Sequence, residues 1–256
     1  MGPDGGPSPE VVVAASDERL AQDTAGRLAG TLIAALAVRP VAHVVLTGGG
    51  ILERVLGALG DRAGQGDVDW RRVHVWWADE RYVGSDSDER NDTAAFAAGL
   101  DGLPLDPALI HRMPAADSRF GDDVEAAARA YAAELTAAAP AEGTATAPHF
   151  DAVLLGVGPD GHCASLFPGH PGVYERGATV IAVHDSPKPP PTRLSFTFDM
   201  LDLSNEVWFV ASGEGKADAV ARALSGADRA QVPAAGPHGS KRTLWLIDPA
   251  AAARLP

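Results

Sequence analysis

The stretch HVVLTGGGILERVLGAL, residues 43–59, decides the fold class of this chain. An apolar, β-branched run from His43 to Thr47 is followed directly by three glycines, and then by apolar residues at helical spacing. This pattern is typical of a buried strand, a tight turn and a helix, the repeating unit of an α/β protein. Runs of the same kinds recur along the chain, so the sequence predicts a mostly parallel, Rossmann-like sheet with helices on both faces.

Elements of the same two kinds are predicted on either side of this stretch. Short β-branched or aromatic runs predict strands at residues 11–15, 73–78, 150–155, 178–183, 193–198, 207–212 and 243–248. Apolar residues at helical spacing predict helices at residues 17–38, 122–138, 216–226 and 249–255. The segment DERYVGSDSDERN, residues 79–91, is rich in charge and is expected to be a loop that leads into an alanine-rich segment.

The length of 256 residues allows one large domain or two small ones. We expect residues 1–9, which are rich in glycine and proline, to be a disordered leader, and residues 10–256 to form a single domain. The stretch of small residues at 140–148 is typical of a linker, but the strand and helix pattern continues beyond it.

Charge and cysteine content exclude several classes of function. With 34 acidic and 21 basic residues the net charge is −13, opposite in sign to that of a duplex-binding surface. A few convergent cations can still draw a small anion into a pocket. No apolar run approaches the roughly 20 residues of a membrane span, and the lone Cys163 fits a reducing compartment. We therefore expect a cytoplasmic protein that binds neither nucleic acid nor membrane.

Ligands of parallel α/β sheets bind beyond the carboxyl ends of the strands, so the residues after each predicted strand are the candidates for a site. The turn Gly48–Gly50 opens a helix and leaves backbone N–H groups available to an anion, although a tight turn alone also favours glycine. The segment GVGPDG, residues 156–161, matches the dinucleotide pattern G-x-G-x-x-G, but Pro168 follows too soon for the helix that such a site needs. We expect no cofactor.

Asp160 and His162, which flank Gly161, are the candidate catalytic pair. A carboxylate beside an imidazole fixes the imidazole tautomer and raises its basicity, as a general base requires. The alternative is a surface turn in which Asp160 caps a short helix and His162 is merely exposed. Cys163 has no feature of an activated thiol, and its spacing to the neighbouring histidines fits no usual zinc pattern, so we expect neither a thiol nucleophile nor a metal.

Two loops supply candidate anion-binding cations. Lys188 and Arg193 lie in DSPKPPPTR, residues 185–193, which is either an anion site or only a rigid connection. Arg81 and Arg90 lie among the acids of the 79–91 segment, where a hydrated loop is the alternative.

Together these motifs resemble the 6-phosphogluconolactonase family over nearly the whole chain after residue 10. The resemblance rests on LTGGG, on WADERYV followed by DERN, on LLGVGPDGHCASLFPGH, on DSPKPPP with a following arginine, and on GKADAV with TLWLID, all in the family's order. It implies an α/β fold shared with glucosamine-6-phosphate deaminases. It also implies hydrolysis of 6-phospho-D-glucono-1,5-lactone to 6-phospho-D-gluconate, in the oxidative pentose phosphate pathway, without a cofactor.

The resemblance also implies roles for individual residues. The family's base is the histidine of the DGH motif, here His162, with Asp160 as its partner. In the family the phosphate is held by the glycine turn and by basic residues of two loops. The expected substrate contacts are Gly48, Gly49, Gly50, Arg81, Arg90, Gly161, Lys188 and Arg193.

Two alternative functions share this fold. The deaminase branch is similar at DGH but continues to Asn-Glu-Pro-Gly, where the glutamate helps to open the sugar ring; this chain has Phe167 in place of that glutamate, and a phenyl ring moves no proton. A non-catalytic sugar-phosphate-sensing domain would need a DNA-binding module, for which residues 1–10 are too short. We expect the lactonase, acting as a monomer or weak homodimer.

Overall fold

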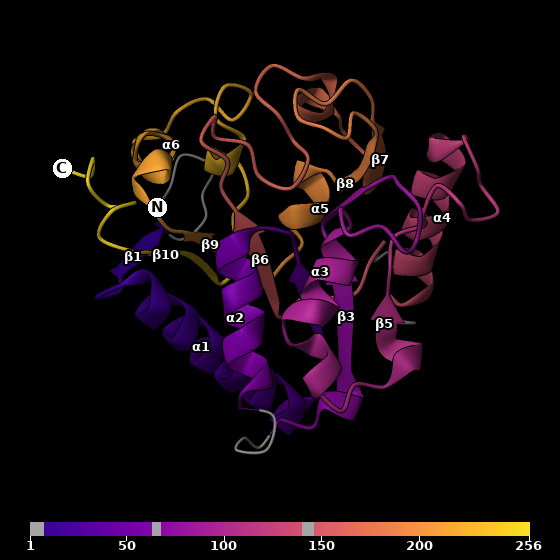
Figure 1. Cartoon of the computed structure of the whole chain (residues 1–256), viewed down its shortest axis with the longest axis horizontal. Helices are drawn as coiled ribbons and strands as arrows, with labels where there is room; N and C mark the ends of the chain where they lie inside the picture. Colours follow the sequence, from indigo (N-terminus) through magenta and orange to yellow (C-terminus); the bar gives the residue numbers. More distant parts are fainter. Residues whose placement is uncertain (1–7, 63–67, 140–145) are drawn as a thin grey trace.

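A computed structural model describes residues 8–62, 68–139 and 146–256 of the chain. At its centre is a seven-stranded sheet in the order β1-β10-β9-β6-β2-β3-β5, in which every neighbouring pair is parallel (Figure 1). Its strands are β1 (Glu10–Val13), β2 (Ala42–Leu46), β3 (Val73–Trp77), β5 (Ile110–His111), β6 (Ala152–Gly156), β9 (Glu206–Ala211) and β10 (Arg242–Ile247). The predicted α/β fold with a mostly parallel sheet is confirmed.

Helices cover the sheet on both faces. They are α1 (Asp17–Val38), α2 (Gly50–Gly60), α3 (Asn91–Ala98), α4 (Val124–Ala137), α5 (Phe198–Leu201) and α6 (Ala217–Leu224). Successive side chains of a strand point to opposite faces. Trp76 of β3 accordingly meets Tyr131 of α4, with ring centroids 6.0 Å apart, whereas Trp77 meets Phe96 of α3 at 6.3 Å. Both tryptophans are fully buried, so each face of the sheet has its own packed core.

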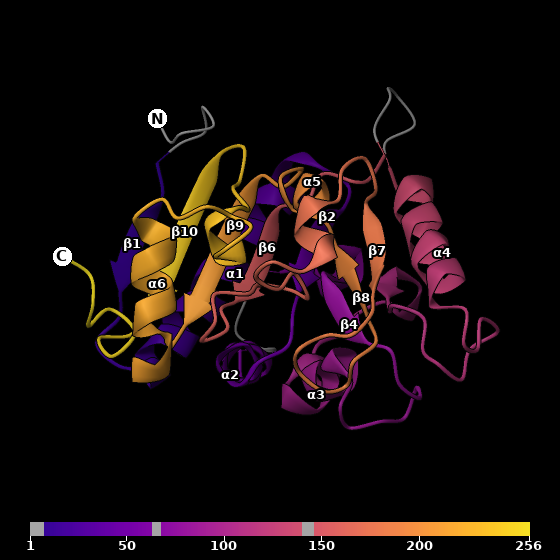
Figure 2. The ribbon, with the colours of Figure 1, turned by 90° about the horizontal axis from the view of Figure 1, so that it is seen from above.

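A second, smaller sheet corrects the prediction for the charged segment. Its first residues form strand β4 (Asp79–Arg81) instead of a loop, and β4 pairs antiparallel with β8 (Arg193–Phe196), which pairs in turn with β7 (Val180–Val183) (Figure 2). The strands predicted at 178–183 and 193–198 therefore exist but lie outside the parallel sheet. The charge pattern hid β4 because its side chains make polar contacts: the Glu80 carboxylate accepts the backbone N–H groups of Asn91 and Asp92.

The helix predicted at residues 249–255 is wrong. This segment is a run of turns, begun by the Asp248 carboxylate, which accepts the backbone N–H of Ala251 at 2.7 Å. The segment lies between Pro249 and Pro256 and has too few residues to offset the cost of nucleating a helix.

The sheet has a topological switch point between β2 and β6. From β2 the chain continues to β3 and β5 on one side, and from β6 it continues to β9 and β10 on the other. The loops that follow β2 and β6 therefore diverge, and such a divergence is where parallel α/β sheets bind ligands. Thr47 spans the gap, because its hydroxyl donates to the Leu154 carbonyl at 3.1 Å and accepts the Gly156 N–H at 3.2 Å.

Most of the predicted leader and of the linker-like stretch lies outside the described residues. Strands from before and after that stretch, β2 and β6, pair within one sheet. Within the described ranges, no helix combines the length and apolar character needed to cross a membrane.

Candidate active site

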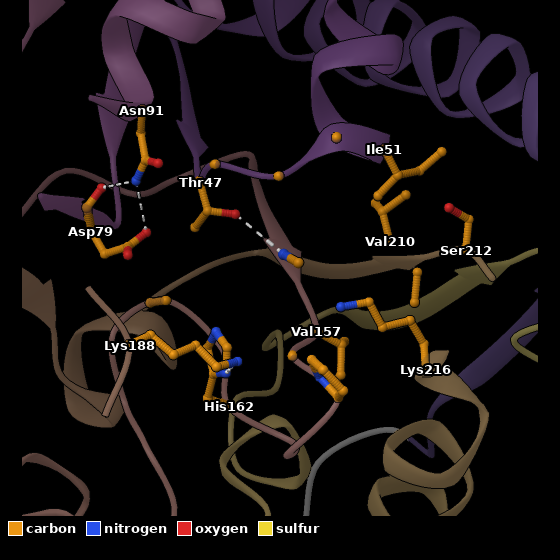
Figure 3. Close-up of a pocket in the computed structure, with 18 of the residues that line it drawn as sticks. Thr47, Ile51, Asp79, Asn91, Val157, His162, Lys188, Val210, Ser212 and Lys216 are labelled. Atoms are coloured by element: carbon orange, nitrogen blue, oxygen red, sulfur yellow. Dashed lines mark hydrogen bonds between the residues drawn. The ribbon is translucent and has the colours of Figure 1, made fainter. Parts of the chain in front are cut away.

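A cavity of about 550 Å³ lies at the switch point (Figure 3). Its walls come from the loops after β2, β3, β6 and β9, and from the proline-rich loop between β7 and β8. The sequence-predicted residues that line it are Gly48, Gly49, Gly50, Arg81, His162, Lys188 and Arg193. Residues more than 140 positions apart in the chain thus meet at the carboxyl edge of the sheet, as the strand-end rule predicts.

His162 and Asp160 form a close pair at this cavity. The Nδ1 atom of His162 lies 2.6 Å from Oδ1 of Asp160. Gly158 makes the pair possible, because a Cβ atom there would lie 2.0 Å from His162 Nδ1 and 2.4 Å from Asp160 Oδ1. The carboxylate accepts a hydrogen bond from Nδ1–H, which leaves Nε2 of the neutral ring free to accept a proton.

Lys188 completes this polar group. Its Nζ lies 3.2 Å from Asp160 Oδ1 and 3.1 Å from His162 Nδ1. Burial alone would raise the pKa of Asp160, but the hydrogen bond from His162 and the Lys188 charge outweigh it and hold that pKa well below its usual range. Asp160 is therefore a carboxylate at neutral pH.

The glycine turn presents the N-terminus of α2 to the same cavity. Gly49 has φ of 129°, a conformation that favours glycine, and it is the N-cap residue of α2 without a side-chain cap. The first N–H groups of the helix are left for a ligand, and the helix dipole favours a negative one. By contrast, no helix begins directly after Gly156–Gly161, as a dinucleotide site would require.

Positive charge gathers in the cavity of this acidic chain. Five cationic side chains line it, those of Arg54, Arg81, Lys188, Arg193 and Lys216. Three carboxylates oppose them, Asp79 in the lining, Asp160 beside Lys188 and Asp17 beside Arg54, so the formal charge is +2. In the register of β4 and β8, moreover, Arg81 and Arg193 stand directly opposite each other. Like charges in such positions repel unless an anion lies between or beside them.

Two of the expected substrate contacts do not line the cavity. Arg90 is 2% exposed, donates to both Asp92 carboxylate oxygens at 2.9 Å, and donates to the Met113 carbonyl at 2.8 Å. It braces the start of α3 from the interior, because it pairs with the acids that surround it. Gly161 is a turn residue with φ of +90°, whose N–H bonds to Gly158 and whose carbonyl accepts from Ala234. Neither residue lines the cavity, so contact of Arg90 and Gly161 with substrate stays a prediction.

Several lining residues were missed from the sequence. Lys216, Arg54, Asp79 and Asn91 all line the cavity. The strand-end rule applied to β9 would have indicated Lys216, since this residue lies five positions beyond the end of that strand. Burial and the Lys188 charge both lower the pKa of Lys216.

Cys163 is fully buried, and burial raises the pKa of its thiol well above the usual range. A thiol in this state is a poor nucleophile. Within the described ranges, no group of three or more histidine, cysteine or acidic side chains is arranged to hold a metal ion.

Comparison with known proteins places this chain in a family. The profile of the glucosamine-6-phosphate isomerases/6-phosphogluconolactonase family matches residues 15–245. The chain is 51% identical over 249 residues to the 6-phosphogluconolactonase of Streptomyces coelicolor, covering 97% of this chain and 95% of that protein. It is 47% identical over 251 residues to the 6-phosphogluconolactonase of Mycobacterium tuberculosis, covering 98% and 96% respectively.

Solved structures share the fold. The 6-phosphogluconolactonase of Thermotoga maritima matches with a TM-score of 0.80 at 23% identity, over 94% of this chain and 100% of that one. A monomeric glucosamine-6-phosphate deaminase matches with a TM-score of 0.78 at 22% identity, over 96% and 99%. The family profile and the two bacterial relatives, each matched over nearly its full length, show that this chain belongs to the glucosamine-6-phosphate isomerase/6-phosphogluconolactonase family.

Proposed function

We propose that this protein hydrolyses 6-phospho-D-glucono-1,5-lactone to 6-phospho-D-gluconate, with His162 as the general base. The observation that supports this most strongly is the joint placement of an imidazole–carboxylate pair and five cations around one cavity. The pair suits attack by water on a carbonyl, and the cations suit a substrate with a phosphate. The bacterial relatives named 6-phosphogluconolactonase agree with this chemistry.

The first step adds water to the lactone. His162 Nε2 takes a proton from water while the water oxygen forms a bond to the C1 carbonyl carbon, and the carbonyl electrons move onto its oxygen. Asp160, bonded to Nδ1, stabilises the imidazolium that results. Cations and N–H groups around the cavity stabilise the oxyanion.

The second step opens the ring. The oxyanion re-forms the carbonyl, the bond between C1 and the ring oxygen breaks, and the imidazolium returns its proton to that oxygen. The products are the open-chain acid and the neutral base. The same histidine thus serves both steps, and no further proton-transfer group is required.

The phosphate supplies binding energy remote from the reacting carbon. The N-terminus of α2, Arg81 and Lys216 are the groups we assign to it, since they line the cavity and lie outside the His162 pair. Anchoring the phosphate orients C1 toward the water, so loss of one of these contacts is expected to lower turnover as well as affinity.

We also propose that residues 10–256 act as one domain, in the cytoplasm, as a monomer or weak homodimer. The pairing of strands from before and after the 140–148 stretch supports the single domain.

The test is to follow acid release from freshly generated 6-phosphogluconolactone above the spontaneous background, with glucosamine 6-phosphate as a parallel substrate. We expect acceleration of lactone hydrolysis and no release of ammonia from the amino sugar. Ammonia release without lactone hydrolysis would overturn the assignment in favour of the deaminase. Binding of both sugars with no turnover of either would favour a sensing domain.

A further inference from the structure

Arg193 is placed unlike a phosphate ligand, although the sequence predicts it to be one. It is the first residue of β8, it is 5% exposed, and its guanidinium points back along the chain toward the loop that precedes it. Nη2 donates to the carbonyls of Lys188 at 3.1 Å and Pro189 at 2.9 Å, and Nε donates to the carbonyl of Pro190 at 3.2 Å. Three consecutive carbonyls thus converge on one side chain.

The loop needs such a donor because of its sequence. Residues 189–191 are all proline, so they have no N–H groups with which to close a turn. Ser186 supplies part of the missing structure, since its hydroxyl donates to the Lys188 carbonyl at 2.9 Å and accepts the Lys188 N–H at 3.3 Å. The planar guanidinium of Arg193 supplies the other donors to the loop carbonyls, and a lysine ammonium lacks the geometry to replace it.

The guanidinium of Arg193 also packs beside an aromatic ring next to the His162 pair. Its central carbon lies 5.6 Å from the centre of the Phe167 ring, and Phe167 is 1% exposed. The Phe167 ring in turn lies 4.7 Å from the His162 ring. Among the described residues, Nη1 is the one guanidinium nitrogen of Arg193 without a protein hydrogen bond.

We propose that Arg193 is a positioning residue that holds the backbone at Lys188, so that the Lys188 ammonium stays beside Asp160 and His162. This inference rests on the proposed function, since it assigns a role within the same site. Arg193 acts through Lys188, and its own charge is not the main contact for the substrate phosphate.

A double-mutant cycle separates this role from direct binding. Arg193→Lys keeps the charge but cannot span three carbonyls, and we expect it to lower kcat/KM for the phosphorylated lactone by about tenfold. In a Lys188→Met background we expect Arg193→Lys to lower kcat/KM by less than about threefold, because the side chain that Arg193 positions is already absent. An equal loss in both backgrounds would overturn the proposal. Ser186→Ala, which weakens the loop from its other side, serves as a second variant with the same expected dependence on Lys188.

A second readout does not depend on turnover. The rate at which Lys188 reacts with an amine-acetylating reagent, measured by peptide mass spectrometry relative to the rate of the exposed Lys241 outside the cavity, reports how Lys188 is held. We expect Arg193→Lys to raise the Lys188 rate several-fold relative to Lys241. An unchanged ratio in a folded variant would contradict the proposal. If the wild type shows no lactone hydrolysis, the proposed function fails, and the labelling ratio still decides whether Arg193 positions Lys188.

Discussion

The single His162 and a group of three other histidines have different surroundings on the same parallel sheet. His162 lies beyond the carboxyl end of β6, beside Asp160 and Lys188, on an open cavity. The other group, the histidine stack, consists of His43 of β2, His74 of β3 and His111 of β5; His43 and His111 are buried and His74 is half-buried.

The histidine stack is held together by ring contacts. His43 and His74 are register partners with ring centroids 4.3 Å apart, and His74 Nδ1 lies 2.8 Å from His111 Nε2. Trp76 lies flat on His111, with centroids 3.6 Å apart, and donates its indole N–H to His43 Nδ1 at 3.2 Å. Glu134 of α4 bonds the outer nitrogen of His111 at 2.6 Å.

The difference shows that the environment of an imidazole, and not its presence, decides its role. Burial lowers the pKa of His43 to about 3 and that of His74 to about 4, and each neighbouring imidazole adds to the effect. These rings are neutral core residues at neutral pH. His162 instead lies beside the Asp160 carboxylate and the Lys188 ammonium, on a cavity from which water can approach.

The largest expected effect comes from breaking the pair at the site. Asp160→Asn keeps the shape of the side chain but removes the charge that stabilises the imidazolium, and an amide can bond the wrong tautomer of His162. We expect kcat for lactone hydrolysis to fall by about 10³-fold. His74→Gln, which alters the histidine stack, is the matched control and should leave kcat within about twofold. A similar fall in kcat in Asp160→Asn and His74→Gln would contradict the distinction between the His162 pair and the histidine stack.

The histidine stack should instead govern stability in acid. The folded-state pKa values of His43 and His74 lie below the unfolded value of about 6.5, so the unfolded chain binds protons at these two residues first as the pH falls. Stability is therefore full above about pH 6.5 and is lost as the pH falls toward the folded values. Between pH 6.5 and 4.5 we expect His43 to account for about 2 kcal/mol of lost unfolding free energy.

Urea unfolding of wild type and His43→Gln at the two pH values checks this expectation. The charges facing the histidine stack are those of Arg39, Asp106 and Glu134, and they are unchanged in the variant. Asp160 does not interfere, because its low folded pKa affects stability only below about pH 4. An equal loss of unfolding free energy between the two pH values in wild type and in His43→Gln would contradict the structural role of the histidine stack.

The smallest effect is expected at Cys163, which adjoins His162 in sequence but is buried. Cys163→Ser should leave kcat within about twofold, and native protein should resist thiol labelling until it is unfolded. Rapid labelling of the native protein would show that the thiol shares the open environment of His162.

The sequence predicts the fold and the contact between Asp160 and His162 better than it predicts the residues around them. Alternating strands and helices indicate the parallel sheet, and strand ends indicate Gly48–Gly50 and His162, because both signals are local. The sequence does not distinguish Arg81 from Arg90, because both lie in one charged segment. In the structure Arg81 belongs to β4, which pairs with β8, and it lines the cavity, whereas Arg90 is buried.

The sequence also does not predict the histidine stack or the orientation of the Arg193 side chain. His43, His74 and His111 are more than 30 residues apart, and only the strand register brings their rings together. Arg193 was expected to bind substrate because basic side chains in a stiff loop suit an anion. That interpretation omitted the carbonyls that three consecutive prolines leave without donors.

The most direct test of the central claim is to compare kcat for 6-phosphogluconolactone hydrolysis in wild type, His162→Ala and His149→Ala, with the spontaneous rate subtracted. His149 is an exposed histidine away from the cavity and controls for the loss of an imidazole. We predict a loss of about 10²- to 10⁴-fold for His162→Ala alone. Wild-type turnover in folded His162→Ala would contradict the assignment of His162 as the base.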